Sequence, residues 1–166
     1  MGSNNLRELE NTLQKDVEAI KGWAKKWGLI INGEKSKALI ITKNHIKYIP
    51  KIKIGGNIVK LEDHIKILGV TVDKSLNWRK HIEDICDKCR GPLNIMRSLT
   101  GKKWGLSTKT LLTIYKSLIL SRIDYGDFLY KNASKSVLNN LNSIQYKALS
   151  VAFGSTIGTS LKKLLI

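Results

Sequence analysis

The sequence has few of the residues that build common catalytic or metal centres. Its 166 residues include only two cysteines, Cys86 and Cys89, and no second pair of Cys or His stands at the spacing of zinc ligands. No Walker loop, nucleophile elbow or HExxH motif is present. No two aspartates are adjacent, although a two-metal phosphoryl-transfer site needs carboxylates that hold two cations about 4 Å apart. The sequence alone therefore does not describe a complete enzyme, and we expect both cysteines to be small buried side chains on one helix face.

Signals for export or membrane insertion are also missing. The sequence has no signal peptide and no apolar run of 18 or more residues. Two cysteines that are expected to be reduced suit an intracellular protein. We therefore predict an intracellular location and no membrane partner.

Acidic residues are scarce. The chain has 29 Lys and Arg against 13 Asp and Glu, a formal net charge of +16, and no acidic residue stands between Lys88 and Ile123. This charge predicts a polyanionic partner, either nucleic acid or an anionic membrane surface, although the basic block has the alternative interpretation of a plain solvated face. The membrane interpretation needs an amphipathic helix with a spare apolar face, and we expect the helices here to use theirs for the core.

The first 76 residues mix helical and strand patterns. Residues 1–3 look like a cloning remnant, and apolar residues at steps of three or four predict a helix from Leu6 to Trp27 that ends at Gly28. The predictions that follow are a buried strand over 29–31, a turn at Asn32-Gly33, a strand over 37–42, and a hairpin of 51–54 with 58–61 through a three-residue loop or bulge. The tryptophans on apolar stripes are expected in the core: Trp23, Trp27 and Trp78.

The stretch from His64 to Trp78 divides the chain. Apolar and β-branched residues alternate over 65–72, which predicts one strand with Gly69 inside it. A glycine there indicates either a β-bulge at a sheet edge or backbone that closely faces a ligand. After Trp78 the period becomes helical. The predicted fold class is α+β, with an N-terminal helix and a small antiparallel sheet over 4–76 and a bundle of three to four helices over 77–166.

The helical part has clear start and stop signals. Gly91-Pro92 predicts a break or kink, because proline lacks an N–H and clashes with the preceding turn. Ser107 is the expected N-cap of a helix that runs to about Asp124. Ser134 is the expected N-cap of a last long helix, which ends at Gly154.

Several short motifs stand in a fixed order along nearly the whole chain. Residues 23–35 read W-x-x-x-W-G-L-x-I-N-x-x-K, and residues 68–82 read L-G-V-x-x-D-x-x-L-x-W-x-x-H-I. Residues 106–119 read L-S-x-x-x-L-L-x-x-Y-K-S-x-I, followed by Tyr125-Gly126 and by Leu141-x-x-x-Gln145. In their order and spacing these motifs resemble the distal palm and thumb of reverse transcriptases from non-LTR (LINE-type) retrotransposons.

The resemblance implies a fragment of an RNA-directed DNA polymerase, with the distal palm over 4–76 and the thumb over 77–166. The metal-binding aspartates of such polymerases lie before the first helix found here, so the chain would not polymerise alone, and Mg²⁺ is implied for the parent enzyme only. The implied partners are an RNA template, a DNA primer and the rest of the parent chain, and an exposed sheet edge would let copies pair. The nucleus is the implied location of the parent element, with the cytoplasm as the alternative.

The resemblance also implies roles for individual residues. Lys35 matches motif D, where a lysine acts as general acid toward the departing pyrophosphate, and the alternative is a turn lysine in water. Leu68 and Gly69 match the primer grip, a hairpin whose backbone lies against the 3′ end of the primer. Apart from the resemblance, Trp104 stands in a loop of basic residues and glycines, which makes it a base-stacking candidate or a cap on the bundle. The thumb residues that would contact duplex phosphates are Lys88, Arg90, Arg97, Lys102, Lys103, Lys109 and Lys116. At helical spacing only about half of them would face the duplex.

A second hypothesis involves no polymerase. The chain would then be a stand-alone basic nucleic-acid-binding or ribonucleoprotein interaction module, in which Leu68 and Gly69 matter only for folding.

Overall fold

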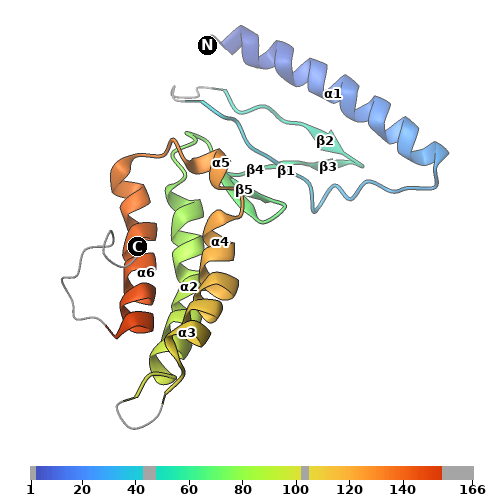
Figure 1. The fold of residues 1–166 in the computed structure, drawn as a ribbon. Helices are drawn as coiled ribbons and strands as arrows, with labels where there is room; N and C mark the ends of the chain where they lie inside the picture. Colours follow the sequence, from blue (N-terminus) through green and yellow to red (C-terminus); the bar gives the residue numbers. More distant parts are fainter. Residues whose placement is uncertain (1–2, 43–47, 102–104, 155–166) are drawn as a thin grey trace. The chain divides into compact units, whose positions relative to one another are not determined.

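A long helix and short strands make up the first half of the chain, and packed helices make up the second (Figure 1). The computed structural model describes residues 3–42, 48–101 and 105–154 and divides into two units, Met1–Leu76 and Asn77–Ile166. The α+β class is confirmed. The single antiparallel sheet is wrong, because the described strands pair two by two and one of these pairs is parallel.

The first helix, α1, runs over Ser3–Lys26 and ends as predicted at Gly28, which has a φ of +67°. The N–H of Gly28 donates to the carbonyl of Lys25 at 3.2 Å, and the N–H of Leu29 donates to that of Ala24 at 2.9 Å. These two bonds form a Schellman motif, which satisfies carbonyls that have no partner within the helix.

The tryptophans of α1 are not in a core. Trp23 and Trp27 are 58% and 69% exposed, whereas Leu6 and Ala24 on the same helix are buried. Trp78, in the second unit, packs against the helical core as predicted. The periodicity of α1 therefore predicts the helix correctly, but only one edge of its apolar face is covered.

The segment after α1 differs from the prediction because Gly33 is constrained by space. Residues 29–31 form no strand, Ile30 is 96% exposed, and Asn32-Gly33 does not connect two strands. A Cβ at Gly33 would lie 2.4 Å from the carbonyl oxygen of Ile54. Gly33 is thus required by close approach to a distant segment and not by a hairpin turn.

The predicted strand over 37–42 is reduced to two residues. β1, Lys37–Ala38, pairs in parallel with β4, Lys60–Leu61, which places Lys37 opposite Lys60. The Glu62 carboxylate contacts both ammonium groups, at 3.3 Å from Lys37 and 3.0 Å from Lys60. Hydrogen bonds from Lys60 and Lys37 hold the pKa of Glu62 below its ordinary value.

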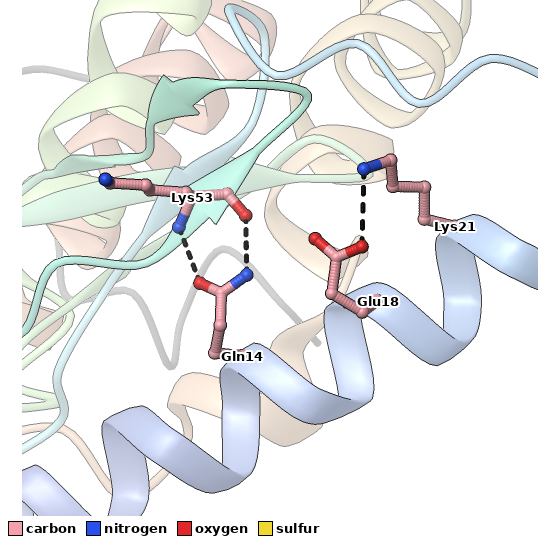
Figure 2. Close-up of polar contacts among 4 residues, drawn as sticks. All are labelled: Gln14, Glu18, Lys21 and Lys53. Carbon is pink, nitrogen blue, oxygen red and sulfur yellow. Dashed lines mark hydrogen bonds and ion pairs between the residues drawn. The ribbon is translucent and has the colours of Figure 1, made fainter.

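The hairpin predicted for 51–54 and 58–61 is present with a shorter, two-residue turn. β2, Lys53–Ile54, pairs with β3, Asn57–Ile58, through Gly55 and Gly56, which both have positive φ as a type I′ turn requires. The side chain of Gln14 in α1 bonds both backbone polar groups of Lys53 (Figure 2). Its Oε1 accepts from the Lys53 N–H at 2.8 Å, and its Nε2 donates to the Lys53 carbonyl at 3.0 Å.

The predicted continuous strand over 65–72 is a hairpin. β5, His64–Ile67, pairs antiparallel with β6, Val70–Asp73. Leu68 and Gly69 form the two-residue turn between them, with φ values of +47° and +90°. Gly69 therefore lies in a turn rather than inside a strand or at a bulge.

The second unit packs its helices around one apolar core. Its elements are α2 (Arg79–Ser98), α3 (Thr108–Tyr115), the π-helical turn η1 (Lys116–Leu120), α4 (Ser121–Asp124), α5 (Asp127–Tyr130) and α6 (Lys135–Phe153). α3, η1 and α4 form the predicted helix to Asp124, and the Oγ of Ser107 caps it by accepting from the N–H of Thr110 at 3.3 Å. The side chains of Ile82, Cys89 and Met96 in α2 are fully buried in this core.

The π turn keeps a line of buried residues in register. Leu111, Tyr115, Ile119 and Ile123 are all buried and follow one another at steps of four. Such a line drifts around an α-helix of 3.6 residues per turn, and one wider π turn reverses the drift. The irregularity therefore follows from the spacing of the core residues.

Gly33→Ala should destabilise the first unit by about 1–3 kcal/mol, because the added methyl group meets backbone that must shift. Gly22→Ala is the matched control: no atom lies within 4 Å of its new Cβ, so the substitution should stabilise α1 by up to about 1 kcal/mol. Urea unfolding followed by circular dichroism measures both. Equal effects would show that Ile54 does not constrain Gly33.

Gln14→Leu should cost about 1–2 kcal/mol and speed hydrogen exchange at the Lys53 amide, because both bonds to that residue are lost. Glu18→Ala, one turn further along α1, removes only the exposed 3.3 Å ion pair with Lys21 (Figure 2) and should cost less than about 0.5 kcal/mol. Residue-resolved exchange by NMR is the measurement. A Lys53 amide that exchanges at the same rate in both variants contradicts the assigned role of Gln14.

Candidate nucleic-acid interface

α2 carries three exposed arginines on one flank. Arg79, Arg90 and Arg97 are 11 and 7 residues apart, which brings successive members within about 20° of each other around the helix axis and spreads them over about 27 Å. We call these three residues the arginine flank. The sequence analysis missed Arg79 because it counted basic residues from Lys88, although the spacing to Arg90 was visible in the sequence.

Two members of the arginine flank are oriented by neighbours on α2. Nη2 of Arg90 lies 3.1 Å from the carboxylate of Asp87, and Nη1 of Arg97 donates to Oδ1 of Asn94 at 3.3 Å. A guanidinium has five N–H donors in a fixed plane, so one such contact positions the group and leaves further donors for a ligand.

Of the predicted break or kink at Gly91-Pro92, the break is absent from α2. The helix continues through Pro92, which is buried. Pro92 has no N–H for the carbonyl of Lys88, four residues earlier. The guanidinium of Arg122, in α4, donates to that carbonyl instead. Arg122 therefore supports α2, whose continuity keeps Arg97 on the arginine flank.

The lysines of the basic block face other directions. Lys88 is two residues from Arg90 and so lies about 160° away around α2. Lys109 and Lys116 are seven residues apart on α3 and η1, on the side opposite the buried Leu111 and Tyr115. We call these two the lysine face. Both are exposed, and neither forms an ion pair with any residue in the described ranges. Lys102, Lys103 and Trp104 lie outside the described residues.

The tip of the β5–β6 hairpin presents backbone and an apolar side chain to solvent. Gly69 is exposed, and Leu68 is 87% exposed. The φ of +47° at Leu68 is in the left-handed region, which costs a non-glycine residue about 1–2 kcal/mol. Strain of this kind persists where the surrounding structure enforces it and often marks functional sites.

Lys35 lies on a turn that Asn32 fixes. Oδ1 of Asn32 accepts from the N–H of Lys35 at 3.0 Å, and Oγ of Ser36 donates to the carbonyl of Asn32 at 2.8 Å. These bonds define the backbone at Lys35, and its side chain is exposed. Lys35 and the hairpin tip belong to the first unit, whereas the arginine flank and the lysine face belong to the second.

The two cysteines and the histidine of α2 are partly or fully buried. Burial raises the pKa of the Cys86 and Cys89 thiols, which keeps them protonated and poorly reactive. His81 is buried, with its ring centroid 6.4 Å from that of Trp78 and 5.4 Å from that of Tyr130.

In the described part of the chain, no group of three or more His, Cys, Asp or Glu side chains is arranged to hold a metal ion. None of the helices there is long and apolar enough to cross a bilayer.

The chain is similar to polymerases of mobile elements. It is 30% identical over 147 residues, 89% of its length, to an RNA-directed DNA polymerase from the mobile element jockey of Drosophila melanogaster, and 30% identical over 148 residues to the jockey polymerase of Drosophila funebris. A probable RNA-directed DNA polymerase from the D. melanogaster transposon X-element is 29% identical over 132 residues. The chain spans 16% of the length of each jockey polymerase and 14% of the X-element protein. No family model matches the chain, and no solved structure matches it significantly.

Arg122→Met should destabilise the second unit by about 1 kcal/mol, because the carbonyl of Lys88 loses its donor. In a Pro92→Ala background the N–H of residue 92 can bond that carbonyl, so the same substitution should cost less than half as much. Urea unfolding of the four members of this double-mutant cycle measures the coupling. Equal costs in both backgrounds would show that Arg122 does not replace the missing bond.

Proposed function

We propose that this chain, which is homologous to the RNA-directed DNA polymerases of non-LTR retrotransposons, is the distal palm and thumb segment of such a polymerase. The first unit would be the palm part and the second unit the thumb. The order of the sequence motifs and the order of the elements, a helix and short strands followed by packed helices, support this assignment. In this proposal the aspartates and the Mg²⁺ that carry out polymerisation belong to the parent enzyme outside this chain.

The proposed activity of the chain itself is binding of an RNA template–DNA primer duplex through its phosphates. The single observation that carries it is the arginine flank, in a unit whose sequence has 15 Lys and Arg against five Asp and Glu. Guanidinium groups bind phosphate oxygens in pairs of parallel hydrogen bonds, which lysine ammonium groups do not. An RNA–DNA hybrid has an A-like, wide and shallow minor groove, so contacts are to backbone and shape rather than to base sequence.

Two features of the first unit fit the same proposal. The exposed turn at Leu68 and Gly69 would place its backbone against the 3′ end of the primer, and the strain at Leu68 is what a backbone held for close approach would show. Lys35, on its anchored turn, would protonate the departing pyrophosphate as general acid. The role of Lys35 rests on the motif resemblance together with the exposure of its side chain.

The logarithm of the affinity of the chain for an RNA–DNA hybrid should fall linearly with the logarithm of the salt concentration. The reason is that the bound Lys and Arg side chains displace counterions from the phosphates. Replacing Arg90 and Arg97 together with Gln should weaken binding at least about tenfold and reduce the salt slope by about 2. Fluorescence anisotropy titrations at several salt concentrations are the measurement, with circular dichroism to verify folding.

The matched control replaces Lys109 and Lys116 with Gln. It removes the same charge, so it reports the loss expected from net charge alone, and we expect about two- to threefold weaker binding. Equal losses in the two double variants would reject the arginine flank as the binding face. A salt-independent affinity of the wild-type chain would reject the proposed function.

A further inference from the structure

A threonine hydroxyl lies beside the last arginine of the arginine flank, just after the end of α2. Thr100 is exposed and follows the last residue of the helix, Ser98, by two positions. Its Oγ1 donates to the carbonyl of Arg97 at 2.8 Å, and its N–H donates to the same carbonyl at 3.3 Å. Residues three apart in such a turn are neighbours, so a group attached to this hydroxyl would lie within reach of the Arg97 side chain.

The residues before Thr100 form a pattern that many protein kinases recognise. Kinases with an acidic substrate site bind an arginine three residues before the acceptor hydroxyl, and a subset of them also binds an apolar side chain five residues before it. Arg97 and Ile95 occupy these two positions, and both are exposed. None of the other four arginines in the sequence has a serine or threonine three residues after it. Thr100 is therefore the hydroxyl of this sequence that fits an arginine-directed kinase.

We propose that Thr100 is a phosphorylation site and that its phosphate withdraws Arg97 from the arginine flank. This inference rests on the proposed function, because the flank is the proposed phosphate-binding face. In the modification, Oγ1 of Thr100 bonds to the γ-phosphorus of Mg²⁺-bound ATP, and the bond from that phosphorus to the β–γ bridging oxygen breaks. ADP leaves, and the hydroxyl proton passes to the catalytic aspartate of the kinase.

The phosphate would compete for a guanidinium that is weakly held. Arg97 is oriented by one hydrogen bond, from Nη1 to Oδ1 of Asn94 at 3.3 Å. A phosphothreonine carries a charge of about −1.5 to −2 and three acceptor oxygens, so it can bind a guanidinium through two parallel hydrogen bonds. Arg97 would then not be available to the duplex, and the new negative charge would repel the duplex phosphates.

The modification would also loosen the last turn of α2. A phosphorylated Oγ1 has no hydrogen to donate, so the carbonyl of Arg97 loses its side-chain donor. A negative group at the C-terminus of a helix is unfavourable, because the carbonyls there already carry partial negative charge. Both effects release Arg97 from its place on the flank and so act in the same direction as the ion pair with the phosphate.

The experiment treats the wild-type chain with Mg²⁺-ATP and the catalytic domain of a calmodulin-dependent protein kinase, and mass spectrometry locates the phosphate. We expect phosphate at Thr100, at least about tenfold weaker binding of the RNA–DNA hybrid in anisotropy titrations, and a salt slope lower by about 1. Phosphatase should restore the affinity. A Thr100→Ala chain treated in the same way reports the effect of phosphates at other residues.

Two glutamate variants separate the contact with Arg97 from the added charge. Thr100→Glu should weaken hybrid binding at least about fivefold. Ser98→Glu is the matched control, because it places the same charge at the same end of α2 but next to Arg97 in sequence, where side chains do not face each other, and it should weaken binding about twofold. In an Arg97→Gln background the two variants should have equal effects. Circular dichroism verifies that each variant is folded.

Three results would overturn the inference: no phosphate at Thr100, unchanged hybrid affinity of the phosphorylated chain, or equal effects of Thr100→Glu and Ser98→Glu when Arg97 is present. The NMR signals of the Arg97 guanidinium give a readout that needs no nucleic acid, and they should shift on phosphorylation. An unphosphorylated chain that does not bind the hybrid would reject the proposed function, while the shift of these signals still tests the contact between the phosphate and Arg97.

Discussion

The hydrogen bond from Arg122 to the carbonyl of Lys88 compensates for the proline inside α2, the helix that carries the arginine flank. α2 has a proline in its interior, and the carbonyl that Pro92 leaves without a helical donor is served by a side chain from α4, 34 residues along the chain from Lys88. Because the helix continues, Arg97 after the proline shares a side with Arg79 and Arg90 before it. A break in the helix at that point would have removed the fixed angular relation between Arg97 and the other two arginines.

The parts of the fold that sequence analysis predicted are those that local chemistry decides. The end of α1 at Gly28 and the N-cap at Ser107 depend on residues within one turn of each other, and both are confirmed. The predictions were wrong where a residue far away in the sequence determines the local structure. Nothing near Gly33 indicates that Ile54 approaches it, and nothing near Pro92 indicates that Arg122 will supply a donor. The exposure of Trp23 and Trp27 is similar, because periodicity predicts an apolar face but not what covers it.

The candidate site was predicted by type of residue and only partly by position. The basic block contained Arg90 and Arg97 together with Lys88, Lys109 and Lys116, and charge counting could not show that these lysines face other directions than the two arginines. Helical spacing makes that separation once the bounds of α2 are known, and it adds Arg79. The hairpin turn at Leu68 and Gly69 was hidden because alternation of β-branched residues continues on both sides of a two-residue turn, so the pattern alone reads as one strand.

The contact between Gln14 and Lys53 has a consequence for how the protein behaves at high concentration. A primary amide side chain offers one acceptor and one donor, the same pair that a neighbouring backbone would offer, so Gln14 stands in for one residue of a third strand beside β2. A strand from another chain could not pair with β2 at Lys53, because the Gln14 amide already bonds the N–H and the carbonyl of that residue. Fibril growth from β2 would first require α1 to detach, which turns a polar contact on the surface of a small domain into a barrier against aggregation.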